Sequence, residues 1–319
     1  MLNNKKLKEM KNGKLITIFC LLFAAGMITM SSCKKNNTAT ADSDTSGATD
    51  NATAENTSND IVAIGAQASE NGSLSSYRDA GSDFVLSTCA TVTRDTNAKT
   101  VLVTFNGGTC LDGRSRSGSL LFDYHLSPAG DNFYRDPGFT FTVTSNNYVV
   151  DGNQVNIISK TVTNTTNGGN HVGWNPATTN ETWAIAANIK ITKPNGDVIT
   201  WNCTRTKTLL NTASVYTAAD LSNYPASDVT PINWPMAKIQ IDGSASGTRA
   251  NGETFTAVAT AMVRDFGGCT IQGRHPWISG TLLYSPAGKY ARLIDFGNGS
   301  CDLNATVTIN GNTYNIVLP

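Results

Sequence analysis

Strict alternation of apolar and polar residues constrains the fold of this chain more than any other feature. The run 139–144 alternates without exception, and every second residue from 183 to 191 is apolar. A period of two is typical of a half-buried β-strand. Helix signals are few, at residues 60–68 and just before Leu221. The sequence therefore predicts an all-β chain, either an antiparallel β-sandwich or a strongly curved sheet, with short helices at most. The runs are separated by pairs that suit tight hairpin turns, namely Asp151-Gly152, Asn195-Gly196, Asn251-Gly252 and Asn310-Gly311.

An internal repeat is the second strong feature. Residues 105–130 and 266–288 share, in the same order, a Phe, a Gly-Gly pair, a Cys, Gly-Arg, Ser-Gly, Leu-Leu and Ser-Pro-Ala-Gly. A further shared segment, Ala-Thr-Val-Thr, comes directly after Cys89 but three residues after Cys301. It therefore precedes the first block and follows the second, so we expect two permuted β repeats in pseudo-equivalent places. The expected copies are about residues 84–146 and 237–319 of one all-β domain, residues 60–319.

The cysteines suggest two bridges within this domain. Two of the seven lie in the first 33 residues, which leaves Cys89, Cys110, Cys203, Cys269 and Cys301. Five cysteines allow fifteen sets of two bridges. If the two copies fold alike, their cysteines pair alike, and each resulting pair straddles a turn. The predicted disulfides are therefore Cys89–Cys110 and Cys269–Cys301. Cys203 shares a strand face with Trp201 and Ile199, and we expect it to be free and buried.

The beginning of the chain has the pattern of an export signal. Five lysines within residues 5–14 precede an apolar run from Leu15 to Met30, and Ser31-Ser32-Cys33 follows. A basic region, a short apolar core and small residues at a cleavage site are typical of a secretory signal. The run is also shorter than the ~20 residues of a membrane-spanning helix. A cysteine directly after the small residues is typical of a bacterial lipobox, so residues 1–32 are predicted as a lipoprotein signal and Cys33 as the lipidated N-terminus.

The next segment has a different composition. Residues 34–59 contain no Leu, Ile, Val, Met or aromatic residue. A segment of this kind buries too little apolar surface to offset its ordering entropy. We therefore expect residues 33–59 to be a lipidated, disordered tether. Without residues 1–32 the chain has 19 basic and 23 acidic residues (24 − 5 and 24 − 1), a net charge of −4. That balance gives no basic footprint for nucleic acid.

Catalytic and metal-binding patterns are not found in the sequence. The three histidines have no metal-ligand spacing, and no nucleophile-elbow, P-loop or dinucleotide motif is present, so no cofactor and no metal are predicted. Trp174 lies in a long loop-like stretch, 167–181, and is a candidate for stacking on a sugar ring. Arg114 and Arg274 stand before the repeated Ser-Gly strands. Each is a candidate contact for an anionic ligand, or alternatively pins a loop through backbone carbonyls or a neighbouring Asp.

The chain also resembles uncharacterised lipoproteins of Bacteroidota. The resemblance rests on the cysteine and glycine framework of residues 84–319, most clearly on Gly247–Gly252 and Asp295–Cys301. It implies a lipid-anchored envelope protein and supplies no activity or catalytic residue. Together these features predict an outer-membrane lipoprotein acting as a non-enzymatic binding, adhesive or scaffold module. Its expected partners are the membrane, through the anchor, and an envelope protein or glycan. The alternatives are an envelope hydrolase acting on glycans, for which carboxylates such as Asp123, Asp131 and Asp136 are candidates, and a carrier of an apolar ligand.

Overall fold

Thirteen antiparallel strands form one sheet, and each strand pairs with the strands that precede and follow it in the chain. This is a computed structural model that describes residues 46–71, 89–110, 112–128, 134–169, 175, 177–215, 236–271 and 275–318. The strands are β1 (Ala90–Asp95), β2 (Thr100–Thr109), β3 (Ser115–Asp123), β4 (Thr140–Val150), β5 (Asn153–Asn164), β6 (Glu181–Thr192), β7 (Val198–Leu209), β8 (Lys238–Thr248), β9 (Thr254–Asp265), β10 (Trp277–Pro286), β11 (Arg292–Asn298), β12 (Asn304–Ile309) and β13 (Asn312–Val317).

The predicted all-β class is confirmed, and of the two predicted architectures the curved sheet is the one observed. Along the strands buried residues alternate with exposed ones, as in β6, where Trp183, Ile185, Ala187, Ile189 and Ile191 are all buried. The buried residues of successive strands form one continuous core. The sheet therefore has an inner apolar face and an outer face rich in threonine. The described residues also include the short helices η3 (Thr166–Gly169) and α3 (Thr212–Val215).

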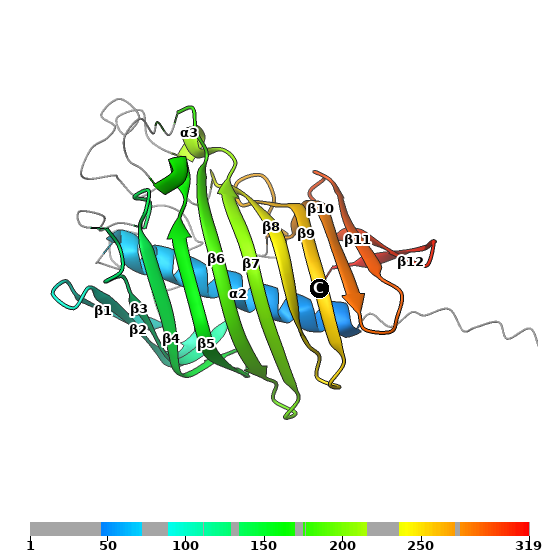
Figure 1. Cartoon of the computed structure of the whole chain (residues 1–319), viewed down its shortest axis with the longest axis horizontal. Coiled ribbons are helices and arrows are strands. Elements are labelled where there is room, and N and C mark those ends of the chain that lie inside the picture. Colours follow the sequence, from blue (N-terminus) through cyan, green and yellow to red (C-terminus); the bar gives the residue numbers. More distant parts are fainter. Residues whose placement is uncertain are drawn as a thin grey trace, which may run out of the picture. The chain divides into compact units, whose positions relative to one another are not determined.

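A long helix, α2 (Ser46–Asn71), covers the inner face of the sheet. In Figure 1 it runs obliquely behind the central strands. Its 26 residues make it about 39 Å long at 1.5 Å per residue, which is the width of about eight strands. Successive turns of α2 contact successive strands: Gly47 lies against Tyr284 of β10, and the Ala68 carbonyl accepts a hydrogen bond from Arg94 of β1.

The predictions of a tether over 33–59 and of short helices at most are wrong where α2 lies. Residues 46–59 are helical, and the expected helix at 60–68 is the second half of the same element. The composition argument failed because the first half of α2 is buried by polar pairing and small residues rather than by large apolar side chains. Asn51, Ala54 and Ser58 are buried on one side of it, at helical spacing. Cys33 lies outside the described residues, as does the predicted capping segment before Leu221.

Small residues on α2 let the helix lie close to the sheet. A Cβ atom at Gly65 would lie 2.7 Å from a ring carbon of Phe122. At Gly47 it would lie still closer to the Tyr284 hydroxyl. Both distances are too short for any side chain, so glycine at these two positions sets how closely α2 approaches the aromatic residues of the sheet.

The pairing registers relate the two ends of the sheet by an approximate two-fold axis perpendicular to it. This axis reverses strand order, so that β1, β2, β3 and β4 correspond to β12, β11, β10 and β9. Residues 90–93 and 305–308, both Ala-Thr-Val-Thr, then occupy corresponding places, as do the Ser-Gly-x-Leu-Leu segments 117–121 and 279–283. The corresponding rows of paired residues are Leu120–Val103–Val92 at one end and Leu282–Ile294–Val307 at the other.

This symmetry confirms part of the predicted repeat and corrects the rest. The Ala-Thr-Val-Thr and Ser-Gly strands are pseudo-equivalent, as expected. In the same register, however, Phe105–Cys110 corresponds to Phe296–Cys301 and not to the segment 266–269, because Val103 corresponds to Ile294. The likeness of the two Phe-Gly-Gly-Cys segments is therefore not a structural equivalence. β13 has no counterpart beyond β1 in the described sheet.

Both predicted disulfides are present. Cys89 is bonded to Cys110, and Cys269 to Cys301. Because only Cys110 and Cys301 are related by the two-fold axis, the pairing is as predicted although half of the argument for it was wrong. Cys203 is free and buried, as predicted. Disulfides persist in oxidising compartments, so the two bridges indicate an extracytoplasmic location. None of the helices described is long and apolar enough to span a membrane.

Candidate functional site: the helix-covered inner face

Buried basic residues are the unusual chemical feature of the inner face. Lysine and arginine side chains are rarely buried unless they are paired. Here most of them alternate with apolar residues along the strands, and several meet acidic and polar side chains of α2. Lys207 and Arg292 are also buried on this face, and the buried basic residues that meet α2 are Arg116, Lys160, Arg205 and Arg249. We call the contact between them and α2 the ionic seam.

The centre of the ionic seam is a buried ion pair between Glu55 of α2 and Arg205 of β7. Arg205 Nη2 lies 2.6 Å from Glu55 Oε2, and Nε donates to both carboxylate oxygens at 3.2 Å. The guanidinium also lies 5.9 Å from the centre of the Trp201 ring. Trp201 donates its indole N–H to Asn51 at 3.0 Å. Arg205 and Trp201 therefore hold two adjacent turns of α2 through directional contacts.

Asp60 joins the next part of α2 to β3 and β4. Arg116 Nη2 lies 2.6 Å from Asp60 Oδ1 and 2.6 Å from Asp112 Oδ2. Burial opposes the charge of Arg116, but hydrogen bonds to Asp112 and Asp60 outweigh it and raise the pKa of Arg116. The Tyr148 hydroxyl donates to Asp60 at 3.3 Å. Burial and the adjacent Asp60 charge raise the pKa of Tyr148, so the phenol stays protonated.

Arg114, a predicted ligand contact, is engaged within the protein. Its Nη1 lies 3.3 Å from Asp60 and its Nε 2.8 Å from Asp151. The second of the two roles considered for this residue, pinning a loop through a neighbouring aspartate, therefore describes its contacts. Arg274 and Trp174 lie outside the described residues.

Lys160 of β5 is the least compensated cation of the seam. Its side chain is 1% exposed, and its ammonium donates to Ser58 at 2.7 Å. Burial lowers the pKa of Lys160 to about 8, although the neighbouring Cys203 and Glu55 oppose this shift. Burial raises the pKa of the Cys203 thiol to about 11. Because the thiolate is the reactive form of cysteine, Cys203 is unreactive at neutral pH.

Lys207 is enclosed by aromatic rings. Its ammonium lies 4.7 Å from the centre of the Trp183 ring and 5.5 Å from that of Tyr134. Tyr134 and Trp183 are stacked with their centres 5.2 Å apart. Aromatic faces attract cations, so this arrangement stabilises a buried ammonium without using a carboxylate of α2.

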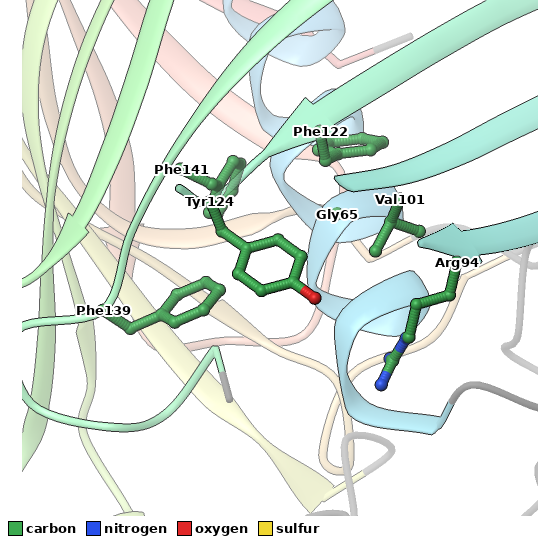
Figure 2. Close-up of a pocket in the computed structure, with 7 residues that line it drawn as sticks. All are labelled: Gly65, Arg94, Val101, Phe122, Tyr124, Phe139 and Phe141. Atoms are coloured by element: carbon green, nitrogen blue, oxygen red, sulfur yellow. The ribbon is translucent and has the colours of Figure 1, made fainter. Parts of the chain in front are cut away.

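A small cavity lies where the second half of α2 meets β1–β4. Figure 2 shows the side chains of Phe122, Tyr124, Phe139 and Phe141 gathered beside Gly65 of the helix. The cavity measures about 20 Å³, which is enough for one water molecule but not for a larger ligand. With α2 in place, the aromatic cluster therefore acts as packing surface.

Among the described residues, the carboxylates considered for glycan hydrolysis form no close pair. Asp123, at the end of β3, accepts a hydrogen bond from the ring of its neighbour His125. Slight burial opposes ionisation, but the hydrogen bonds from His125 outweigh it and lower the pKa of Asp123. Asp136 is buried in the segment before β4, and Asp131 lies outside the described residues. Within the described ranges, no group of three His, Cys, Asp or Glu side chains is placed to hold a metal ion.

Sequence reasoning missed the ionic seam, although a signal for it was present. Arg205 and Lys207 stand at alternate positions of β7, on the same face as Trp201 and Cys203. Basic residues on the apolar face of a strand require a buried partner. On the helix, Asp50, Asn51, Glu55 and Ser58 follow helical spacing and supply such partners.

No family model, curated protein or solved structure matches this chain.

Proposed function

We propose that this chain is an exported, lipid-anchored protein of the cell envelope that works as a non-enzymatic binding or scaffold module. The observation that carries the proposal is that α2 fills the inner face of the sheet through the ionic seam. A curved sheet whose inner face is already filled meets other molecules through its outer face, its loops and its edges. The cavity beside Gly65 is too small for an apolar ligand, so the carrier alternative gains no support.

The proposed location combines the leader pattern with the disulfides. The signal-like residues 1–32 and Cys33 support export and lipidation, and the two bridges suit an oxidising compartment. Under this proposal Cys33 carries the anchor to the outer membrane. Ser46, the first residue of α2, follows Cys33 by 13 positions (46 − 33), a span of about 45 Å at most when fully extended. The sheet is therefore held near the membrane surface.

Lipidation is tested by labelling cells with an alkyne fatty acid. We expect the wild type to be labelled and to sediment with membranes, and Cys33→Ala to lose both properties. Cys20→Ala is the matched control, because Cys20 lies in the predicted signal and should not carry lipid. Equal labelling of Cys33→Ala and wild type would contradict the anchor.

The binding mode is tested by titrating the purified protein with a fluorescent fatty acid. We expect no saturable binding at one molecule per chain, because the inner face is occupied. Stoichiometric binding that is displaced by unlabelled fatty acid would contradict the proposal and favour an apolar carrier.

A further inference from the structure

Within the described residues, the outer edge of β13 has no charged side chain, proline or bulge to protect it. Exposed edges are usually blocked by charged residues, prolines or bulges. Residues 303–318 contain no charged residue and no proline, and β13 pairs with β12 in an unbroken register. Val317 is 72% exposed, while Tyr314 and Ile316 are only partly buried beside the core. No strand of the described sheet pairs with this edge.

The backbone groups that point away from β12 can be assigned from the register. The Leu318 N–H donates to the Leu303 carbonyl at 2.7 Å. In an antiparallel ladder both backbone groups of a residue point to the same neighbour, and successive residues alternate between neighbours. Tyr314 and Ile316 therefore bond to β12 like Leu318. Thr313, Asn315 and Val317 direct their N–H and C=O groups outward.

The opposite edge of the sheet is not equivalent. β1 carries Arg94 and Asp95, and Arg94 donates to the last turns of α2 at Ala68. If β13 paired with β1 of a second copy and the inner faces stayed on one side, the two paired strands would be parallel, because β1 and β13 run in the same direction. A two-fold axis perpendicular to the sheet reverses the strand direction and keeps the face. It therefore brings β13 against a second β13 in antiparallel orientation.

We propose that two copies of this chain associate through β13, with Asn315 on the two-fold axis. This register pairs Thr313 with Val317 of the partner subunit and leaves none of the three outward-pointing residues without a partner. It gives six backbone hydrogen bonds, two for each hydrogen-bonded pair. Tyr314 then lies opposite Ile316 of the partner subunit on the inner face. An aromatic side chain beside a β-branched one is a favourable cross-strand pair. The proposal does not depend on lipidation or on the proposed binding role.

The register is tested by cysteine cross-linking of the full chain in mild detergent. Cα atoms of a hydrogen-bonded antiparallel pair lie about 5.5 Å apart, within the range of a disulfide. Asn315→Cys should therefore form a covalent dimer on mild oxidation. Val317→Cys is the matched control, since it is exposed on the same strand but lies two residues from the axis, about 14 Å from its symmetry mate at ~3.4 Å per residue. The double variant Thr313→Cys with Val317→Cys should cross-link again.

Sedimentation measures the association without any cross-link. The wild type should show a reversible, concentration-dependent doubling of mass. Asn315→Lys should lose the dimer because two ammonium groups would meet at the axis, while its thermal unfolding matches that of the wild type at concentrations where the wild type is monomeric. The proposal is overturned if the wild type stays monomeric at all concentrations, if Val317→Cys cross-links as well as Asn315→Cys, or if Asn315→Lys remains dimeric.

Discussion

Replacing Glu55 with glutamine tests whether α2 is an integral part of the fold. The change keeps the shape of the side chain but removes the charge opposite Arg205, whose side chain is 1% exposed. Removing one partner of a buried ion pair typically costs about 3–5 kcal/mol, because the remaining charge is left uncompensated. Typical domains are stable by about 5–15 kcal/mol. The loss would therefore be a large fraction of the total stability.

Urea unfolding followed by tryptophan fluorescence is the suitable assay. The Trp201 indole lies beside Arg205 and donates to Asn51, so its emission reports on the docking of α2. Asp295→Asn is the control, because Asp295 is exposed and its loss should change the free energy of unfolding by less than about 0.5 kcal/mol. Combining Glu55→Leu with Arg205→Met should recover most of the loss, since the uncompensated charge is then removed. A cost below about 1 kcal/mol for Glu55→Gln would refute the ionic seam.

Three further predictions concern stability. Lys160→Met should stabilise the protein by up to about 3 kcal/mol, because the pKa of Lys160 falls from 10.5 to about 8 on folding. This gain in the free energy of unfolding should be full below pH 8 and vanish as pH rises toward 10.5, where the unfolded chain also loses the proton. A gain that is independent of pH would contradict this explanation. Gly118→Ala and Gly280→Ala should each cost at least about 1–2 kcal/mol in thermal unfolding, because both residues have positive φ and face a backbone carbonyl across a bulge; a cost at only one of them would argue against the two-fold relation. Replacing Cys269 and Cys301 together by alanine should cost about 3–4 kcal/mol in urea unfolding, from a loop of 32 residues, whereas an unchanged midpoint would show that this bridge does not constrain the unfolded chain.

The strands could be predicted from the sequence because their burial is encoded locally. Alternation at 139–144 and 183–191 marks residues that face the core whatever their partners are. The disulfides could be predicted because each bridges neighbouring parts of one sheet end. The first half of α2 could not, because nothing within residues 46–59 shows that Arg205 and Lys160 lie opposite them. Its burial depends on pairs between segments far apart in the chain, and a local composition rule does not detect them.

The path of α2 across the sheet has a consequence for the order of events during synthesis. Every strand pairs with its neighbour in the chain, so each hairpin can close as soon as it is made. The hydrogen bonds of α2 to the rest of the chain span sequence separations from 26 residues, for Ala68 with Arg94, to 208 residues, for Asn56 with Arg264; Asp60 with Arg116 spans 56 and Ser46 with Arg249 spans 203. The helix is made first, but the partner of its first turn is made only when most of the sheet exists. A contact of α2 closes a loop of chain between its two residues, and lengthening that loop from 56 to 203 residues adds only about 1 kcal/mol of entropy cost. The contact of Ser46 with Arg249 therefore forms later than that of Asp60 with Arg116 but is little weakened by its longer loop. Until Arg249 emerges, the inner face of the growing sheet is only partly covered, and this interval is when a chaperone would have access to it.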